Sequence, residues 1–111
     1  GIYLRGRYEV QIIDSYGQEL NSMTIGGVYG FIEPAFDAAG KAGEWQTFEL
    51  TLAGRHVTLV HNGIEVISNR PIPGITGGSL SSKEGDPGPL MLQGDHGPVE
   101  FRKLVITPSL N

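Results

Sequence analysis

The stretch His56–Ser68 constrains the fold more than any other part of the chain. At its centre Asn62 and Gly63 separate two runs of β-branched and aliphatic residues. Asn-Gly is the favoured pair for a two-residue type I′ turn, because both central residues of that turn need positive φ. The turn places His61 opposite Ile64 and fixes the register of a β-hairpin. A regular ladder then pairs Leu59 with Val66 and Val57 with Ser68, and its core face holds Val57, Leu59, Ile64 and Val66, with His61 packed at the end.

The first fourteen residues alternate between apolar and polar side chains, which is typical of an extended strand with two different faces. The apolar face consists of Ile2, Leu4, Tyr8, Val10 and Ile12. The second face consists of Tyr3, Arg5, Arg7, Glu9 and Gln11. This polar row is either a solvated outer face of a sheet or, on its rigid support, the lining of a site for a polar ligand such as a sugar.

Several further short strands and many Gly- and Pro-containing turns predict an all-β protein. Within Trp45–Ala53, Phe48, Leu50 and Leu52 share one face, and Pro71–Pro89 is too rich in Gly and Pro for regular structure. With about seven strands and no helical pattern, the prediction is one antiparallel β-sandwich of jelly-roll type over residues 1–111. The other strands expected are Val28–Ile32, ended by Pro34, then Leu90–Gln93 and a closing strand Val99–Thr107.

Composition narrows the classes of partner. The formal net charge of −4 and the absence of a basic run argue against a nucleic-acid surface. No apolar run approaches membrane-spanning length, so no membrane span is expected. The chain contains no Cys, which excludes disulfides and thiolate chemistry. No signal peptide is recognisable in it.

Five stretches, in this order and spacing, together resemble the 3-keto-disaccharide hydrolase family. The stretches are Ile2–Asp14, Val28–Gly30, Gly43–Gln46, His61–Gly63 and Leu92–Arg102. The resemblance implies a concanavalin-like jelly roll that processes carbohydrate, in a periplasmic or secreted bacterial protein. Members normally carry further strands before the segment that matches Ile2, and Lys103 stands where Asn is common. We therefore expect an uncovered sheet edge, and self-association through it or membership of a longer polypeptide.

A 3-keto-glycoside needs a base for the acidic C2 proton, a cation or metal for the enolate oxygen, and an acid for the leaving group. Glu9 is the first candidate for the base or for a metal ligand, with an exposed ion pair as its structural alternative. His96, in a Gly-flanked turn, has an imidazole suited to acid–base work, and otherwise bonds to Asp95 or backbone. Arg5 is the candidate cation. A divalent metal held by Glu9 and His96 is conceivable, although no spacing in the chain matches a known metal motif.

The candidate sugar-binding residues have hydrogen-bonding or aromatic side chains on polar faces or turns. The structural alternatives are a solvated ion pair for Arg102 and a core or rim position for Trp45. The predicted set is Gln11, Tyr29, Trp45, Gln93 and Arg102. His56 is expected to be solvated. The same jelly roll could instead be a non-catalytic carbohydrate-binding module or a self-assembling domain, because fold does not decide function.

Overall fold

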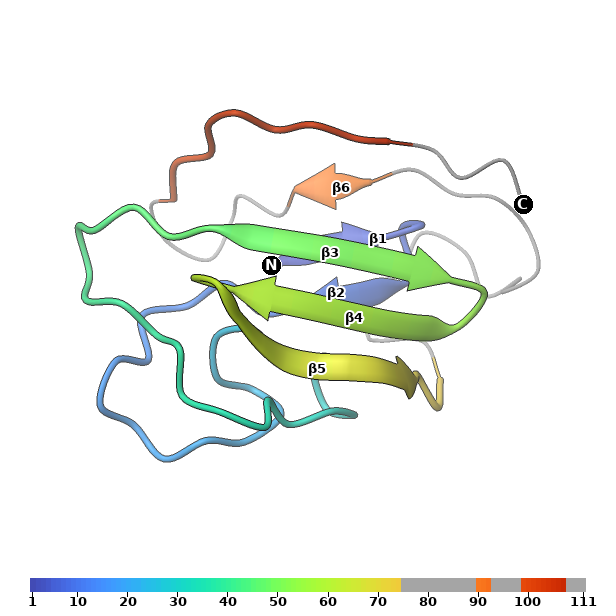
Figure 1. The fold of residues 1–111 in the computed structure, drawn as a ribbon, viewed down its shortest axis with the longest axis horizontal. Helices are drawn as coiled ribbons and strands as arrows, with labels where there is room; N and C mark the ends of the chain where they lie inside the picture. The colour runs from blue at the N-terminus through green and yellow to red at the C-terminus, as the bar shows by residue number, and fades with distance from the viewer. Residues whose placement is uncertain (75–89, 93–98, 108–111) are drawn as a thin grey trace.

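The computed structural model describes residues 1–74, 90–92 and 99–107 (Figure 1). Within these residues the secondary structure is β-strand only, in two antiparallel sheets. The strand order is β2-β1-β6 in one sheet and β3-β4-β5 in the other. The predicted all-β class is therefore confirmed. The strands are β1 (Ile2–Leu4), β2 (Tyr8–Val10), β3 (Phe48–Ala53), β4 (His56–His61), β5 (Ile64–Pro71) and β6 (Met91–Leu92).

The two sheets form the layers of a sandwich, and the β3-β4-β5 sheet lies in front of β1 and β2 in Figure 1. Their facing sides share one apolar cluster, to which both sheets contribute side chains. Three further members come from connecting segments, and Phe48, Leu50 and Leu52 of β3 pack against the cluster as predicted. The buried members are Ile2, Leu4, Tyr8, Val10, Val28, Ile32, Val57, Leu59, Val66, Ile67 and Ile72.

The opening stretch is a tight hairpin rather than the single strand predicted. Arg5 and Gly6 have φ of 52° and 66°, and the N–H of Arg7 donates to the carbonyl of Leu4 at 3.0 Å. Two consecutive residues in the left-handed region reverse the chain, and Gly6 adopts that region at no steric cost. Residues opposite each other in a hairpin share a face, so the predicted division into two faces survives the reversal.

The second face of this hairpin is covered, so its reading as a solvated outer face is wrong. The exposed fractions are 2% for Tyr3, 1% for Arg7 and 7% for Glu9. Buried polar groups are normally hydrogen-bonded, because desolvation without a partner is costly. Tyr3, Arg7 and Glu9 therefore form an internal polar layer, whereas Arg5 and Gln11 are half-buried.

The Asn62-Gly63 turn is confirmed, but the ladder beyond it is irregular. Asn62 and Gly63 have φ of 50° and 80°, and His61 pairs with Ile64 as predicted. Beyond a β-bulge, Leu59 pairs with Ile67 rather than with Val66. A bulge adds a residue to one strand and shifts the alternation of its side chains. Val66 and Ile67 are both buried in consequence, whereas the predicted core residue Ile64 is 42% exposed.

Two other predicted strands are not formed. Val28 and Ile32 exchange two backbone hydrogen bonds of 3.0 Å across a turn in which Gly30 has φ of 79°. This stretch is a tight turn whose two ends enter the core. Residues 99–107 have no strand assignment, and Val105 is 82% exposed. A regular strand needs a neighbour for its backbone, and within the described residues β1 is the only partner of β6, so no ladder extends to this segment.

Two expected boundaries also moved. The predicted strand from Trp45 begins at Phe48, which leaves Trp45 in the preceding loop. The short strand expected over residues 90–93 is present as β6, which pairs with β1. The predicted irregular segment begins one residue late, because Pro71 is the last residue of β5 and pairs with His56. Residues 72–74 have no strand assignment, and the rest of the segment lies outside the described residues.

Candidate functional site

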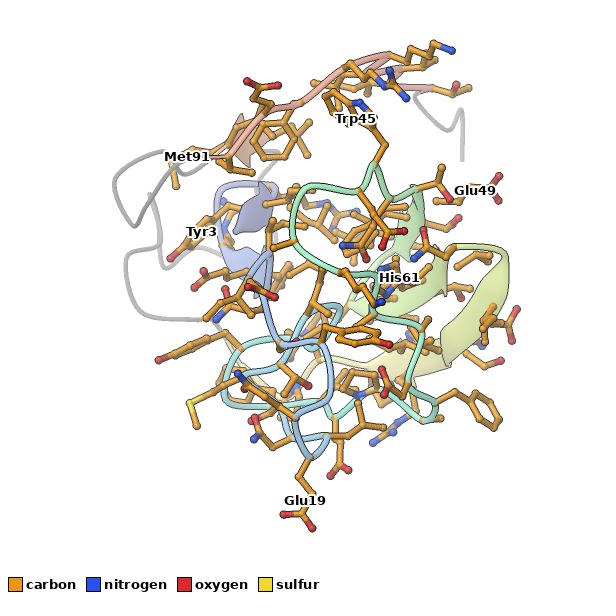
Figure 2. The ribbon with its side chains drawn as sticks, turned by 90° about the vertical axis from the view of Figure 1, so that its left-hand side faces the viewer. Tyr3, Glu19, Trp45, Glu49, His61 and Met91 are labelled. Atoms are coloured by element: carbon orange, nitrogen blue, oxygen red, sulfur yellow. The ribbon has the colours of Figure 1, made fainter. Side chains whose placement is uncertain are left out.

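Trp45 and Arg102 form an exposed aromatic–cation pair. The guanidinium carbon of Arg102 lies 3.9 Å from the centroid of the Trp45 ring, and the indole remains 51% exposed. Figure 2 shows Trp45 extending from the loop before β3 towards the C-terminal segment. An indole offers an apolar face to the C–H groups of a sugar, and an arginine offers several N–H donors in a plane. Two residues predicted separately as sugar-binding are thus neighbours.

The loop that carries Trp45 packs against a buried histidine. His61 is 1% exposed, its ring meets Phe48 edge-on at 4.6 Å, and its Nε2 lies 2.7 Å from Oε1 of Gln46. The same Oε1 accepts the backbone N–H of Gly40 at 2.9 Å, so His61 must be the donor in their contact. Burial lowers the pKa of His61, and the charge of Asp37 raises it by a smaller amount. The prediction of a packed His61 is confirmed.

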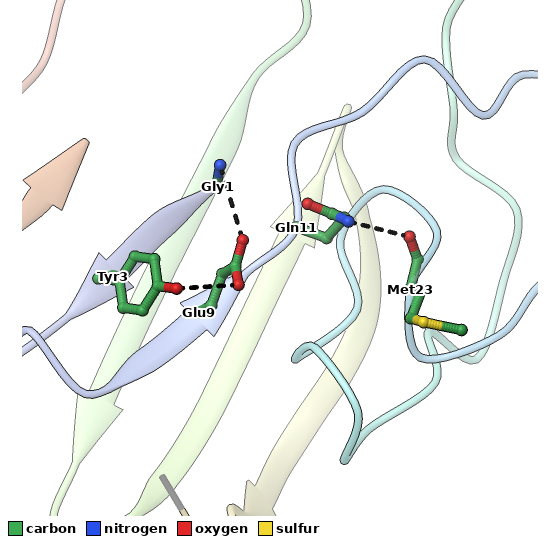
Figure 3. A network of polar contacts seen from close by, with 5 residues as sticks. All are labelled: Gly1, Tyr3, Glu9, Gln11 and Met23. Carbon is green, nitrogen blue, oxygen red and sulfur yellow. Dashed lines mark hydrogen bonds and ion pairs between the residues drawn. The ribbon is translucent and has the colours of Figure 1, made fainter. Parts of the chain in front are cut away.

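Glu9 lies in the buried polar layer of the first sheet (Figure 3). Its Oε1 accepts a hydrogen bond of 3.2 Å from the hydroxyl of Tyr3, and its Oε2 lies 3.8 Å from the amino nitrogen of Gly1. Tyr3 and Glu9 are directly opposite each other in the β1–β2 ladder, which explains the contact. The carboxylate is thus held in place by its strand pair, a partnership that the predicted single strand did not reveal.

The side chains of Gln11 and Arg5 both donate hydrogen bonds to backbone carbonyls. Nε2 of Gln11 donates to the carbonyl of Met23 at 3.3 Å, as Figure 3 shows. Nη1 of Arg5 donates at 2.7 Å to the carbonyl of Gly54, in the turn between β3 and β4. Arg5 therefore connects the ends of the two sheets. Neither contact brings these residues to the carboxylate of Glu9.

Tyr29 is placed beside Glu9 by its backbone, because its N–H donates to the carbonyl of Glu9 at 2.9 Å. Its side chain is 40% exposed. Gln93 and His96 lie outside the described residues, so the predicted pairing of Glu9 with His96 around a metal is not tested. Within residues 1–74, 90–92 and 99–107 there is no group of three His, Asp or Glu side chains placed to hold a metal ion.

Sequence reasoning missed the polar side chains that support Trp45. Gln46 follows Trp45 directly, and the Asn62 side chain contacts the same loop. The sequence indicates Asn62 only as a turn residue, through its backbone. Its side-chain contacts join positions far apart in the sequence, and no local pattern reports them.

No helix long and apolar enough to cross a membrane occurs in the described part of the chain. No curated protein matched the chain. Among solved structures, it is similar to one described as a "putative glycosyl hydrolase" from Parabacteroides distasonis ATCC 8503. The match has a TM-score of 0.66 and 30% sequence identity, and it covers 81% of this chain.

The chain spans 44% of the length of that solved chain. Residues 1–107 match the family described as 3-keto-alpha-glucoside-1,2-lyase-like domain. This match covers both sheets and the Trp45–Arg102 pair, and it agrees with the resemblance found in the sequence motifs. The chain therefore belongs to the 3-keto-alpha-glucoside-1,2-lyase-like domain family.

Proposed function

We propose that this chain is a carbohydrate-active domain that acts on 3-keto-glycosides and binds them at Trp45 and Arg102. The observation that carries the proposal is the exposed indole with a guanidinium 3.9 Å from its centre. Sugars combine apolar C–H faces with hydroxyl groups, and this pair offers a complement to both. The family match supports 3-keto-glycosides as the substrate class, and the description of the structural neighbour supports a glycoside substrate more generally.

The reaction we propose is an elimination followed by hydration. A base removes the proton from C2, which the C3 ketone acidifies, and the electrons form an enolate. The enolate expels the group at C1, whose oxygen takes up a proton, and a C1–C2 double bond remains. Water then adds its hydroxyl to C1 and its proton to C2, so that the net change is hydrolysis. General acid–base groups of this kind contribute about 100- to 10,000-fold each.

In this scheme the carboxylate of Glu9 is the base, with the Tyr3 hydroxyl holding one of its oxygens. His96 is the proposed acid for the leaving group. Arg5 already donates to the carbonyl of Gly54, so we assign the cation for the enolate oxygen to Arg102 instead. A periplasmic or secreted location is part of the same proposal, because it follows from the family resemblance.

The test is binding and turnover of methyl 3-keto-α-D-glucopyranoside. We expect Trp45→Ala to weaken binding about tenfold, which corresponds to ~1.4 kcal/mol. We expect Glu9→Gln to keep binding and to lose turnover by about 100-fold or more. Phe36→Ala and Glu49→Gln are matched controls, because both side chains are exposed and lie outside the proposed site. Equal binding by wild type and Trp45→Ala would refute the proposed platform.

A second candidate is a non-catalytic carbohydrate-binding module. The burial of Glu9 favours it, because a base must reach the proton that it removes. In that case the Trp45–Arg102 pair binds the glycoside and no variant changes turnover, since the wild type shows none. Calorimetry and product analysis on one sample separate the two candidates.

We also propose that the chain associates with a second copy of itself through residues 99–107. Five large apolar side chains in this segment are at least 36% exposed, and β3 and β6 each end a sheet in the described part of the chain. Exposed apolar segments beside open strand edges favour pairing between chains. The five side chains are Val99, Phe101, Leu104, Val105 and Ile106.

A further inference from the structure

The loop that presents Trp45 is fastened at both ends by Asn62. The side-chain Nδ2 of Asn62 donates to the carbonyl of Ala38 at 2.8 Å. Its Oδ1 accepts the N–H of Thr47 at 2.9 Å, and its own backbone N–H donates to the carbonyl of Thr47 at 2.9 Å. Asn62 sits at the tip of the β4–β5 hairpin, so residues 38–47 leave the hairpin tip and return to it.

Gln46 closes the same loop from within. Its Oε1 accepts from three donors, the N–H of Gly40 at 2.9 Å, Nε2 of His61 at 2.7 Å and Nδ2 of Asn62 at 3.3 Å. A single acceptor thus joins the loop, the end of β4 and the turn. The bonds from Gly40 and His61 are partly buried, whereas those of Asn62 are exposed. Hydrogen bonds that share a partner polarise and strengthen one another.

The contact between Gly40 and Gln46 leaves little space. A Cβ placed on Gly40 would lie 3.1 Å from Cδ and 3.2 Å from Cγ of Gln46. The backbone of the loop therefore packs directly on the glutamine side chain. In Figure 2 the loop rises from the level of His61 to Trp45, which extends from it towards the C-terminal segment.

We propose that Asn62, Gln46 and His61 are positioning residues that hold the Trp45 indole against Arg102 before a saccharide arrives. Trp45 precedes Gln46 directly in the chain, so a displacement of Gln46 also moves the indole. Preorganisation of a binding surface increases affinity, because less conformational freedom is lost on binding. The ligand part of this inference rests on the proposed function, whereas the positioning of Trp45 does not.

The test uses Asn62→Gly in the full chain, with Asn69→Gly as its matched control. Glycine accepts the positive φ of both positions, 50° and 46°, so each change removes an amide side chain without straining the backbone. Trp45 is the one tryptophan in the sequence, so its fluorescence anisotropy reports the mobility of the indole directly. Affinity for methyl 3-keto-α-D-glucopyranoside is measured on the same samples.

We expect Asn62→Gly to lower the anisotropy of Trp45 and to weaken glycoside binding about fivefold, and Asn69→Gly to do neither. Gln46→Glu keeps an oxygen for all three donors and should retain the anisotropy of Trp45 and the glycoside affinity of the wild type. Gln46→Met has no such oxygen and should lower both the anisotropy and the affinity. This second pair also tests the inference if Asn62→Gly does not fold. Unchanged anisotropy in Asn62→Gly and in Gln46→Met overturns the inference. A wild type that binds no glycoside refutes the proposed function, and the anisotropy comparison still decides the positioning.

Discussion

Asn62 shows how one residue can serve the backbone and the site together. Its positive φ completes the type I′ turn, and its amide holds the two ends of the loop that carries Trp45. Asparagine is unusual in tolerating the left-handed region while offering both a donor and an acceptor. Glycine would satisfy the turn alone. The side chain at this position therefore matters for the loop rather than for the hairpin.

His61 makes the stability of the fold depend on pH. Burial lowers its pKa in the folded chain, whereas the ordinary value of 6.5 applies when the chain is unfolded. As the pH falls below 6.5, the unfolded chain takes up a proton that the folded chain does not. The free energy of unfolding therefore decreases until the folded histidine also titrates, and this contribution is then constant. Asp37 reduces the effect without reversing it.

Thermal melts between about pH 7 and pH 5 test this dependence. We expect the melting temperature of the wild type to fall across this range, and His61→Gln to fall less steeply. His56→Gln is the control, because His56 is exposed and should leave the profile unchanged. Parallel profiles for wild type and His61→Gln would contradict the prediction.

The β-bulge in β5 decides which isoleucine stabilises the core. Ile67 is 2% exposed and belongs to the core cluster, whereas Ile64 is 42% exposed. We expect Ile67→Ala to lower the free energy of unfolding by about 2–5 kcal/mol, because it leaves a cavity between the sheets. Ile64→Ala should cost less than about 1 kcal/mol. Urea unfolding of the two variants provides the comparison, and the opposite ranking would indicate the regular ladder expected from the turn alone.

The elements that sequence reasoning predicted correctly depend on local chemistry. The Asn62-Gly63 turn requires two positive φ values, and an Asn-Gly pair in the sequence predicts such a turn. The alternation in β3 also held. The bulge beside Val66 was missed because it depends on how the sheet twists over its partner, which adjacent residues do not encode. The opening hairpin was missed because a reversal at Gly6 keeps the same two faces that a single strand would have.

The candidate site was predictable in its residue types and not in its arrangement. The side-chain chemistry of Trp45 and Arg102 indicates each as a sugar-binding residue, but their contact joins positions far apart in the sequence. Conversely, Arg5 and Gln11 were chosen from a polar row, but each donates to a backbone carbonyl. Alternation identifies the face of a strand but does not reveal what covers that face.

At the scale of the whole molecule, the C-terminal segment stands apart from the sandwich. Residues 99–107 lie beyond β3 and β6 at the upper edge of Figure 1. Leu104, Val105 and Ile106 are 54%, 82% and 64% exposed. Water-exposed aliphatic side chains in such a run favour burial against another surface.

We expect this segment to drive association of the chain with a second copy. In sedimentation velocity the weight-average mass of the wild type should rise with protein concentration, because burial of apolar surface stabilises the complex. Val105→Lys places a charge in the middle of the exposed run and should shift the sedimentation profile towards that of the monomer. Phe36→Lys removes another exposed apolar side chain elsewhere and should leave the association unchanged. A wild type that stays monomeric at all concentrations, or a Phe36→Lys variant that dissociates as readily as Val105→Lys, would contradict this assignment of the interface.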